Sequence, residues 1–146
     1  MNPLRHVLSV DIRTTPEALW DALTKPEFTR QYFHQTEVES TWQRGAPFEY
    51  RMTNGAVAAR GEVLESDPPR RLVISWRFDY SPDVASDPPS RVTFEIVPKG
   101  ALCTLTVVHD DFASETNTYK AVGGGWPKII ASLKNLLETG VALPVE

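Results

Sequence analysis

Apolar and polar residues alternate along most of the chain, and this alternation predicts β-strands. In residues 72–79 every second position is a large apolar residue, namely Leu72, Ile74, Trp76 and Phe78. A period of two is typical of a strand with one buried face. Similar patterns predict further strands at residues 7–14, 37–42, 48–52, 56–65, 92–96 and 102–108. The pairs Asn54-Gly55 and Lys99-Gly100 favour tight turns, so we expect these strands to follow one another mainly as hairpins.

Two regions change to a helical period. Thr15, Pro16 and Glu17 are typical of a helix N-terminus, and this helix should end before Pro26. A second short helix is expected over residues 27–33. Near the C-terminus, apolar residues recur at helical spacing at Trp126, Ile129, Ile130, Leu133 and Leu137.

We expect this long C-terminal helix to begin near Pro127 and to end at Gly140. A less regular helix is expected over residues 114–122, separated from the long one by Gly123-Gly124-Gly125. Residues 80–90, with three prolines and three aspartates, are expected to form a mobile loop. The element order predicts an α+β fold, in which a curved antiparallel sheet of six to seven strands packs on the C-terminal helix.

Composition narrows the function classes. The chain has 146 residues with 15 basic and 19 acidic side chains, a net charge of −4, so we expect one domain over residues 1–146 that binds neither nucleic acid nor an anionic membrane. No long apolar run suggests a signal peptide or a membrane span, which predicts a cytoplasmic protein. The single cysteine, Cys103, has no basic neighbour in the sequence and is interpreted as a packing residue. The number of aromatic residues is less ordinary, with four Trp, four Tyr and six Phe.

Several motifs in order along the chain resemble a known family. They are residues 15–24 (TPEALWDALT), 61–65 (GEVLE), 67–72 (DPPRRL), Ser75-Trp76, 105–112 (LTVVHDDF), Gly125-Trp126 and 136–140 (LLETG). Together they resemble the family named for the C-terminal domain of the activator of the heat-shock-protein-90 ATPase, within the START-like (Bet v-like, SRPBCC) helix-grip superfamily. The chain departs from the family pattern at Asp111, where glycine is expected.

The resemblance implies a sheet that grips the C-terminal helix, with a cavity between them. Members of the superfamily use this cavity for lipids, polyketides, hormones or other apolar molecules, and a few use it as an active site. The family's namesake instead binds a chaperone. Since one fold serves several functions, the resemblance alone does not choose between them.

Aromatic and large apolar residues on the faces expected to point at the helix are candidate ligand contacts. With the polar His109, the predicted ligand-binding residues are Tyr32, Phe33, Phe48, Tyr50, Met52, Trp76, Phe78, Phe94, His109, Trp126 and Ile130. The alternative interpretation of the same residues is ordinary core packing. For His109 the alternatives are an acid or base that faces the cavity and a structural histidine, of which we favour the second.

Three hypotheses follow. The first is a non-catalytic protein that binds an apolar or aromatic small molecule. The second is an enzyme of cyclase or hydrolase type, with His109 as base and Tyr50 or Arg60 as helper. The alternative interpretation of Arg60 is that it forms a solvated pair with Glu62 on the outer face of the sheet. The third is a module that modulates a chaperone ATPase. The sequence predicts no metal site and no cofactor, and it leaves a homodimer open.

Overall fold

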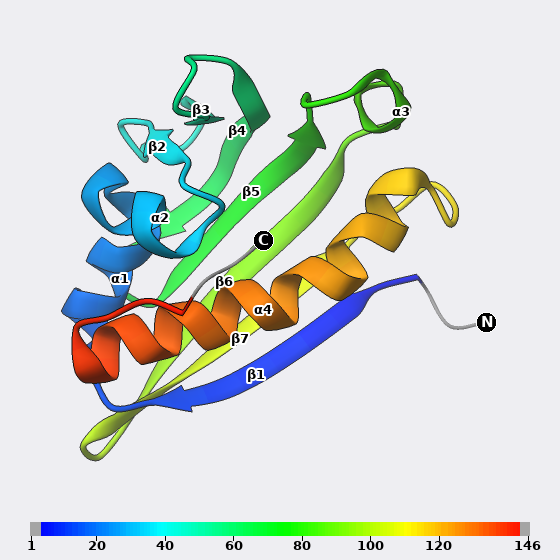
Figure 1. The fold of residues 1–146 in the computed structure, drawn as a ribbon. Coiled ribbons are helices and arrows are strands. Elements are labelled where there is room, and N and C mark those ends of the chain that lie inside the picture. Colours follow the sequence, from blue (N-terminus) through cyan, green and yellow to red (C-terminus); the bar gives the residue numbers. More distant parts are fainter. Residues whose placement is uncertain (1–3, 144–146) are drawn as a thin grey trace.

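The computed structural model describes residues 4–143 and contains seven strands and four helices. In chain order the elements are β1 (His6–Ile12), α1 (Pro16–Thr24), α2 (Pro26–Tyr32), β2 (Glu37–Glu39), β3 (Pro47–Arg51), β4 (Val57–Asp67), β5 (Arg71–Phe78), α3 (Pro82–Ala85), β6 (Ser90–Lys99), β7 (Leu102–Asp110) and α4 (Asn117–Thr139). The strands form one antiparallel sheet in the order β1-β7-β6-β5-β4-β3-β2. The predicted α+β fold is confirmed: the sheet curves around α4, and α1 and α2 close one end (Figure 1).

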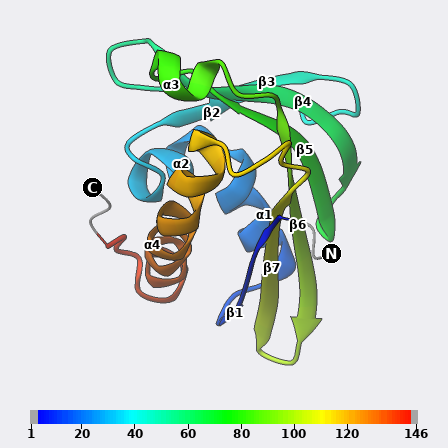
Figure 2. The same ribbon diagram turned by 90° about the vertical axis from the view of Figure 1, so that its right-hand side faces the viewer.

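The curvature of the sheet is concentrated in β4. The pairing of β4 with β5 shifts register between Val63 and Glu65, and such a bulge bends a strand and increases its twist. Gly61 lies just before this point, where a Cβ atom would be 2.1 Å from the carbonyl oxygen of Ser75 and 2.6 Å from the ring of Phe48. Only glycine allows this close approach. The bend turns the outer strands over α4 and gives the sheet a concave face (Figure 2).

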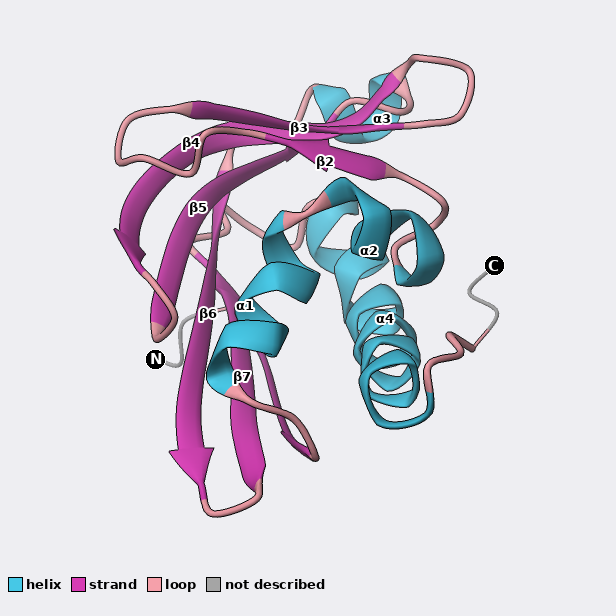
Figure 3. Ribbon diagram, turned by 90° about the vertical axis from the view of Figure 1, so that its left-hand side faces the viewer, coloured by secondary structure: helices cyan, strands magenta, loops and turns pink. Residues whose placement is uncertain are grey.

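The start of α1 follows the sequence pattern closely. The Thr15 hydroxyl accepts a hydrogen bond from the Ala18 amide at 3.1 Å, and Pro16 occupies the first turn. The next helix begins at Pro26, and the Tyr32 hydroxyl at its end donates to the Ala22 carbonyl at 2.7 Å. The two short helices are therefore fixed to each other, and Figure 3 shows them beside α4 on the concave side of the sheet.

The prediction of a break at Gly123-Gly124-Gly125 is wrong, because α4 is one continuous helix with Pro127 in its interior. Tertiary packing outweighs the low helix propensity of these residues. Gly123 lies against the imidazole ring of His6, and a Cβ atom there would be 2.8 Å from that ring. The helix begins instead at Asn117, and the hydroxyl of the N-cap residue Thr116 accepts from the Tyr119 amide at 3.1 Å.

Two further boundaries differ from the prediction. The strand β2 ends at Glu39, because Trp42 has a φ of 60° and sends its indole N–H to the Thr24 carbonyl at 2.9 Å. The predicted loop 80–90 contains the short helix α3, whose Ala85 carbonyl accepts two hydrogen bonds from the Arg77 guanidinium. None of the helices in residues 4–143 has the length and hydropathy needed to cross a membrane.

Candidate functional site

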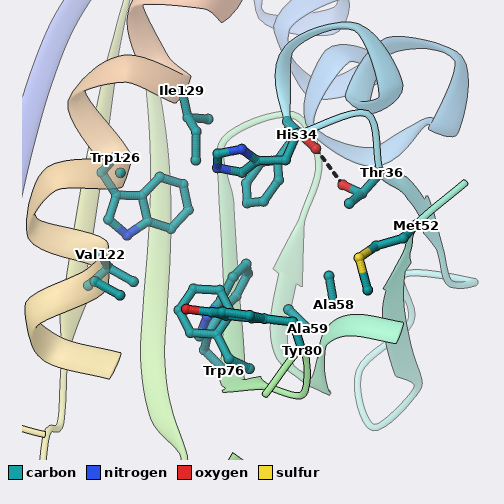
Figure 4. A pocket seen from close by; sticks show the side chains of 14 residues that line it. His34, Thr36, Met52, Ala58, Ala59, Trp76, Tyr80, Val122, Trp126 and Ile129 are labelled. Carbon is teal, nitrogen blue, oxygen red and sulfur yellow. Dashed lines mark hydrogen bonds between the residues drawn. The ribbon is translucent and has the colours of Figure 1, made fainter. Parts of the chain in front are cut away.

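A cavity of about 350 Å³ lies between the sheet and the N-terminal half of α4 (Figure 4). Strands β4 and β5, the turn after α2 and the segment after β5 form the other walls. The lining consists of Phe33, His34, Thr36, Met52, Ala58, Ala59, Trp76, Phe78, Tyr80, Ala121, Val122, Gly125, Trp126 and Ile129. Apolar side chains therefore make nearly all of the surface, and no Asp, Glu, Lys or Arg is among the lining residues.

Small residues leave this space unfilled. Ala58 and Ala59 on β4, and Ala121 and Gly125 on α4, are all among the lining residues. A Cβ atom added at Gly125 would have no atom within 4 Å. At these four positions the chain supplies no large side chain to close the gap between helix and sheet, which side chains of a packed core would normally fill.

Trp76 forms the centre of the aromatic wall. Its ring lies 5.5 Å from Phe78, 5.8 Å from Trp126 and 6.1 Å from Phe33, measured between ring centroids. The side chain is buried, with 1% of its surface exposed. Among the described residues, its indole Nε1 is the one buried side-chain nitrogen or oxygen without a hydrogen-bond partner. The surrounding rings hold Trp76 in place by packing.

His109 supports this wall from behind. The Trp126 indole N–H donates to His109 Nδ1 at 3.0 Å, so Nδ1 is the acceptor and Nε2 carries the hydrogen. That N–H donates to the Ser90 hydroxyl at 2.6 Å, and the hydroxyl donates to the Trp76 carbonyl at 3.4 Å. The chain of hydrogen bonds links the two tryptophans of the cavity wall through a neutral imidazole.

The neutral form of His109 is strongly favoured. Burial, and to a smaller extent the nearby His6, lower the pKa of His109 to about 3, although Asp110 acts in the opposite direction. His109 is fully buried and is not part of the cavity lining. Both of its ring nitrogens are used within the protein, which favours the structural interpretation over that of an acid or base.

His34 lies at the rim, on the turn between α2 and β2. Its backbone has a φ of 51° and that of Gln35 a φ of 58°, in the left-handed region that residues other than glycine seldom adopt. The Thr36 hydroxyl donates to the Phe33 carbonyl at 2.6 Å and closes the turn. Figure 4 shows the imidazole directed toward Trp126 and Ile129 of α4. Partial burial, and then the charge of Lys128, lower the pKa of His34.

Five of the predicted ligand-binding residues line the cavity, namely Phe33, Met52, Trp76, Phe78 and Trp126. Six do not, namely Tyr32, Phe48, Tyr50, Phe94, His109 and Ile130, all of which are buried in the core. Tyr32 is held by α1, and Tyr50 stacks on Phe33 at 4.6 Å between ring centroids. Burial raises the pKa of both tyrosines, so these phenols stay neutral at physiological pH.

The residues expected to act together in an enzyme are not brought together. His109 and Tyr50 are buried outside the lining, and Arg60 is exposed on β4. The interpretation of Arg60 and Glu62 as a pair also needs correction, because Arg60 forms its ion pair with Asp79. In residues 4–143, no three or more His, Cys, Asp or Glu side chains are placed to hold a metal ion.

Sequence reasoning missed His34, Thr36, Ala58, Ala59, Tyr80, Ala121, Val122, Gly125 and Ile129 in the lining. Most of these are small or lie in connections between elements. The usable signal was the run of small residues on facing elements: Ala58-Ala59 on a strand and Ala121 and Gly125 on a helix. Prediction from large aromatic residues identified one part of the cavity wall and omitted the small residues that leave the space unfilled.

Comparison with known proteins identifies the family. A family model described as "Activator of Hsp90 ATPase homolog 1-like protein" matches residues 13–138. The chain belongs to this family. The match includes the whole cavity lining and every strand except β1, so the cavity lies within the family's own fold. No curated protein sequence matches the chain.

Solved structures with the Hsp90-activator-like fold resemble the chain over almost its full length. Protein MLL2253 from Mesorhizobium loti is 27% identical with a TM-score of 0.76, and the match covers 91% of this chain and 96% of that one. The Aha1 dimer from Colwellia psychrerythraea is 15% identical, with a TM-score of 0.74 and coverage of 93% and 97%. PFC0360w, an HSP90 activator from Plasmodium falciparum, is 21% identical, with a TM-score of 0.72 and coverage of 91% and 93%. The last two support the fold alone.

Proposed function

We propose that this member of the Hsp90-activator-like family binds an apolar, aromatic small molecule in the cavity beside α4. The observation that carries the proposal is the cavity itself, with about 350 Å³ of space lined almost entirely by apolar and aromatic side chains. Ligand sites commonly have volumes of about 300–1,000 Å³ and such a lining. The volume is at the lower end of that range and favours a compact ligand.

The aromatic wall favours a flat ligand. Trp76, Phe78 and Trp126 expose ring surfaces of different orientation to the same space, with Trp76 and Phe78 at 87° and Trp76 and Trp126 at 54° to each other. A planar ring inserted there would stack on one of them and meet the edges of the others, the arrangements that aromatic pairs prefer. The hydrogen bonds through His109 hold Trp126 in a fixed orientation before a ligand enters.

A binding role without catalysis agrees best with the polar groups at the cavity. Among the lining residues, His34 and Tyr80 are of the types that serve as acids or bases in enzymes, and both lie on connections at the rim. No second acid or base lies beside either of them in the lining. The site thus offers orientation and apolar contact, without the paired groups that general acid–base catalysis uses.

Two variants of α4 test the proposal. Gly125→Leu should place its side chain in the cavity, whereas Gly124→Leu makes the same change one position away, where the residue is exposed. Thermal shifts would be measured with naphthalene- and anthracene-based compounds. We expect stabilisation of the wild type and of Gly124→Leu, and none of Gly125→Leu. Equal behaviour of the two variants, or no stabilisation of the wild type by any compound, would contradict the proposal.

Modulation of a chaperone ATPase is the second candidate, because the family description and the Plasmodium structure both name Hsp90 activation. It is tested by the ATPase rate of Hsp90 with and without this protein. An unchanged rate at saturating protein excludes this role. A homodimer also stays a prediction, which sedimentation analysis of the purified chain would test.

A further inference from the structure

Two exposed basic side chains near the mouth of the cavity, His34 and Lys128, have no partner within the described residues. His34 lines the cavity from the α2–β2 turn, and Lys128 lies on α4 next to Ile129, which also lines it. No hydrogen bond or ion pair of either side chain is found within residues 4–143, although most other cationic side chains there are paired. The two groups lie close enough for the charge of Lys128 to lower the pKa of His34.

The backbone holds His34 over the cavity at an energetic cost. Two consecutive residues other than glycine, His34 and Gln35, have φ values of 51° and 58°. Each such conformation is energetically unfavourable, and such strain is concentrated at binding and active sites. The outcome here is an exposed imidazole that reaches toward α4 at the rim of the cavity, as Figure 4 shows.

The charges around the rim favour an anion. The lining contains no carboxylate that could neutralise a protonated His34, and no ion pair of Lys128 is found within residues 4–143. Tyr80, which also lines the cavity, has a hydroxyl that can donate a hydrogen bond. An anionic group between His34 and Lys128 would relieve the repulsion between these two bases and accept charge-assisted hydrogen bonds from both.

We propose that the ligand is an aromatic carboxylate, whose ring lies against Trp76 and Trp126 and whose carboxylate lies at the rim between His34 and Lys128. This inference rests on the proposed function and adds the charge of the ligand and its direction of entry. The ring enters first and the charged end stays near solvent, where the cost of removing water from it is lowest.

A pair of probes with the same shape tests the charge. Binding of 2-naphthoate and of the neutral 2-naphthamide would be measured by titration calorimetry at pH 6.5 and low ionic strength. We expect the wild type to bind 2-naphthoate about tenfold more tightly, since hydrogen bonds to charged groups are stronger than those between neutral groups. The preference should decline at high salt, as expected for partly exposed charges.

Three variants test whether His34 and Lys128 cause the preference for 2-naphthoate over 2-naphthamide. Lys128→Met and His34→Asn should each reduce the ratio of the two affinities several-fold, and asparagine tolerates the left-handed backbone at position 34. Lys120→Met, an exposed position on the same helix outside the lining, is the matched control and should keep the wild-type ratio. Unchanged affinity of 2-naphthamide in Lys128→Met and Lys120→Met shows that the cavity is intact, whereas His34→Asn changes the lining itself and is compared through the ratio of the two affinities alone.

The outcomes separate this inference from the proposed function. Equal affinity of the wild type for both probes, or a preference that Lys128→Met leaves unchanged, overturns the anion site while the binding cavity stands. Failure of both probes to bind at millimolar concentration counts against the proposed function, and the anion site fails with it.

Discussion

The two halves of α4 face interiors of different kinds. The C-terminal half inserts Leu133 and Leu136 into a closed core with Leu19 of α1 and Ile12 of β1. The N-terminal half presents Ala121, Val122 and Gly125 to the cavity. Both halves cover the same concave sheet, so the difference comes from side-chain size on the helix and on the strands opposite.

The halves also differ in how they are held. At the C-terminal end, Lys134 donates to the Asp11 carbonyl and Glu138 accepts from the Arg13 amide at 2.9 Å, which ties the helix to β1. At the other end the amide and hydroxyl of Thr118 both donate to the Asp87 carboxylate at 2.8 Å. Hydrogen bonds thus fix both ends of α4, and the C-terminal half is held in addition by packing in the closed core. The comparison indicates that a closed core secures the fold, which permits the cavity beside it.

The largest expected effect on stability comes from truncating a side chain in the C-terminal half of α4, which packs in the closed core. Leu133→Ala should lower the free energy of unfolding by about 3 kcal/mol or more, because Leu133 is fully buried among core residues. Ile129→Ala, one helical turn away, should cost only about 1–2 kcal/mol, because the cavity already flanks that side chain. Urea denaturation measures both values. Equal losses would show that the two halves are packed alike.

The free energy of unfolding should depend on pH through His109, which accepts a hydrogen bond from Trp126 of α4. Its pKa of about 3 in the folded protein is below the ordinary value of 6.5, so the unfolded chain binds the proton first as the pH falls. The stabilisation is complete above about pH 6.5 and is lost progressively from there toward pH 3.

At pH 5 the loss attributable to His109 should be roughly 2 kcal/mol. His109→Asn, which cannot titrate, should have a shallower dependence of unfolding free energy on pH between 5 and 7. A variant with the wild-type slope would mean that His109 is accessible to protons in the folded state.

The three consecutive glycines of α4 provide a finer comparison. Gly124→Ala and Gly125→Ala should each stabilise the protein by about 1 kcal/mol, because neither Cβ would meet another atom and alanine favours the helix. Gly123→Ala should instead be destabilising, since its Cβ would be 2.8 Å from the His6 ring. Thermal unfolding distinguishes them, and stabilisation of all three variants would contradict the contact between β1 and α4.

The smallest effect is expected at Asp111, on the connection from β7 to α4. Its φ of 63° is in the left-handed region, which glycine adopts without the steric cost that other residues meet. Asp111→Gly should raise the free energy of unfolding by about 0.5 kcal/mol. A decrease measured by chemical denaturation would indicate that the aspartate side chain stabilises this turn by contacts of its own.

Most of the fold could be predicted from the sequence, because the strands have strict alternation and α1 has an explicit cap at Thr15. The continuity of α4 through Gly123 could not, since it depends on the contact with His6, far away in the sequence. The cavity was predicted only in part. Phe94 and Trp76 have the same alternating pattern, yet only Trp76 lines the cavity. Whether a face is packed or hollow depends on what lies opposite, and a local pattern does not contain that information.

A methyl NMR titration with 2-naphthoate tests the central claim most directly, because it compares the two halves in one experiment. The prediction is that the methyl signals of Met52, Ala59, Val122 and Ile129 shift, while those of Leu19, Leu105 and Leu133 do not. Shifts spread equally over both groups, or the absence of any shift at saturating ligand, would contradict a preformed aromatic cavity beside the N-terminal half of α4.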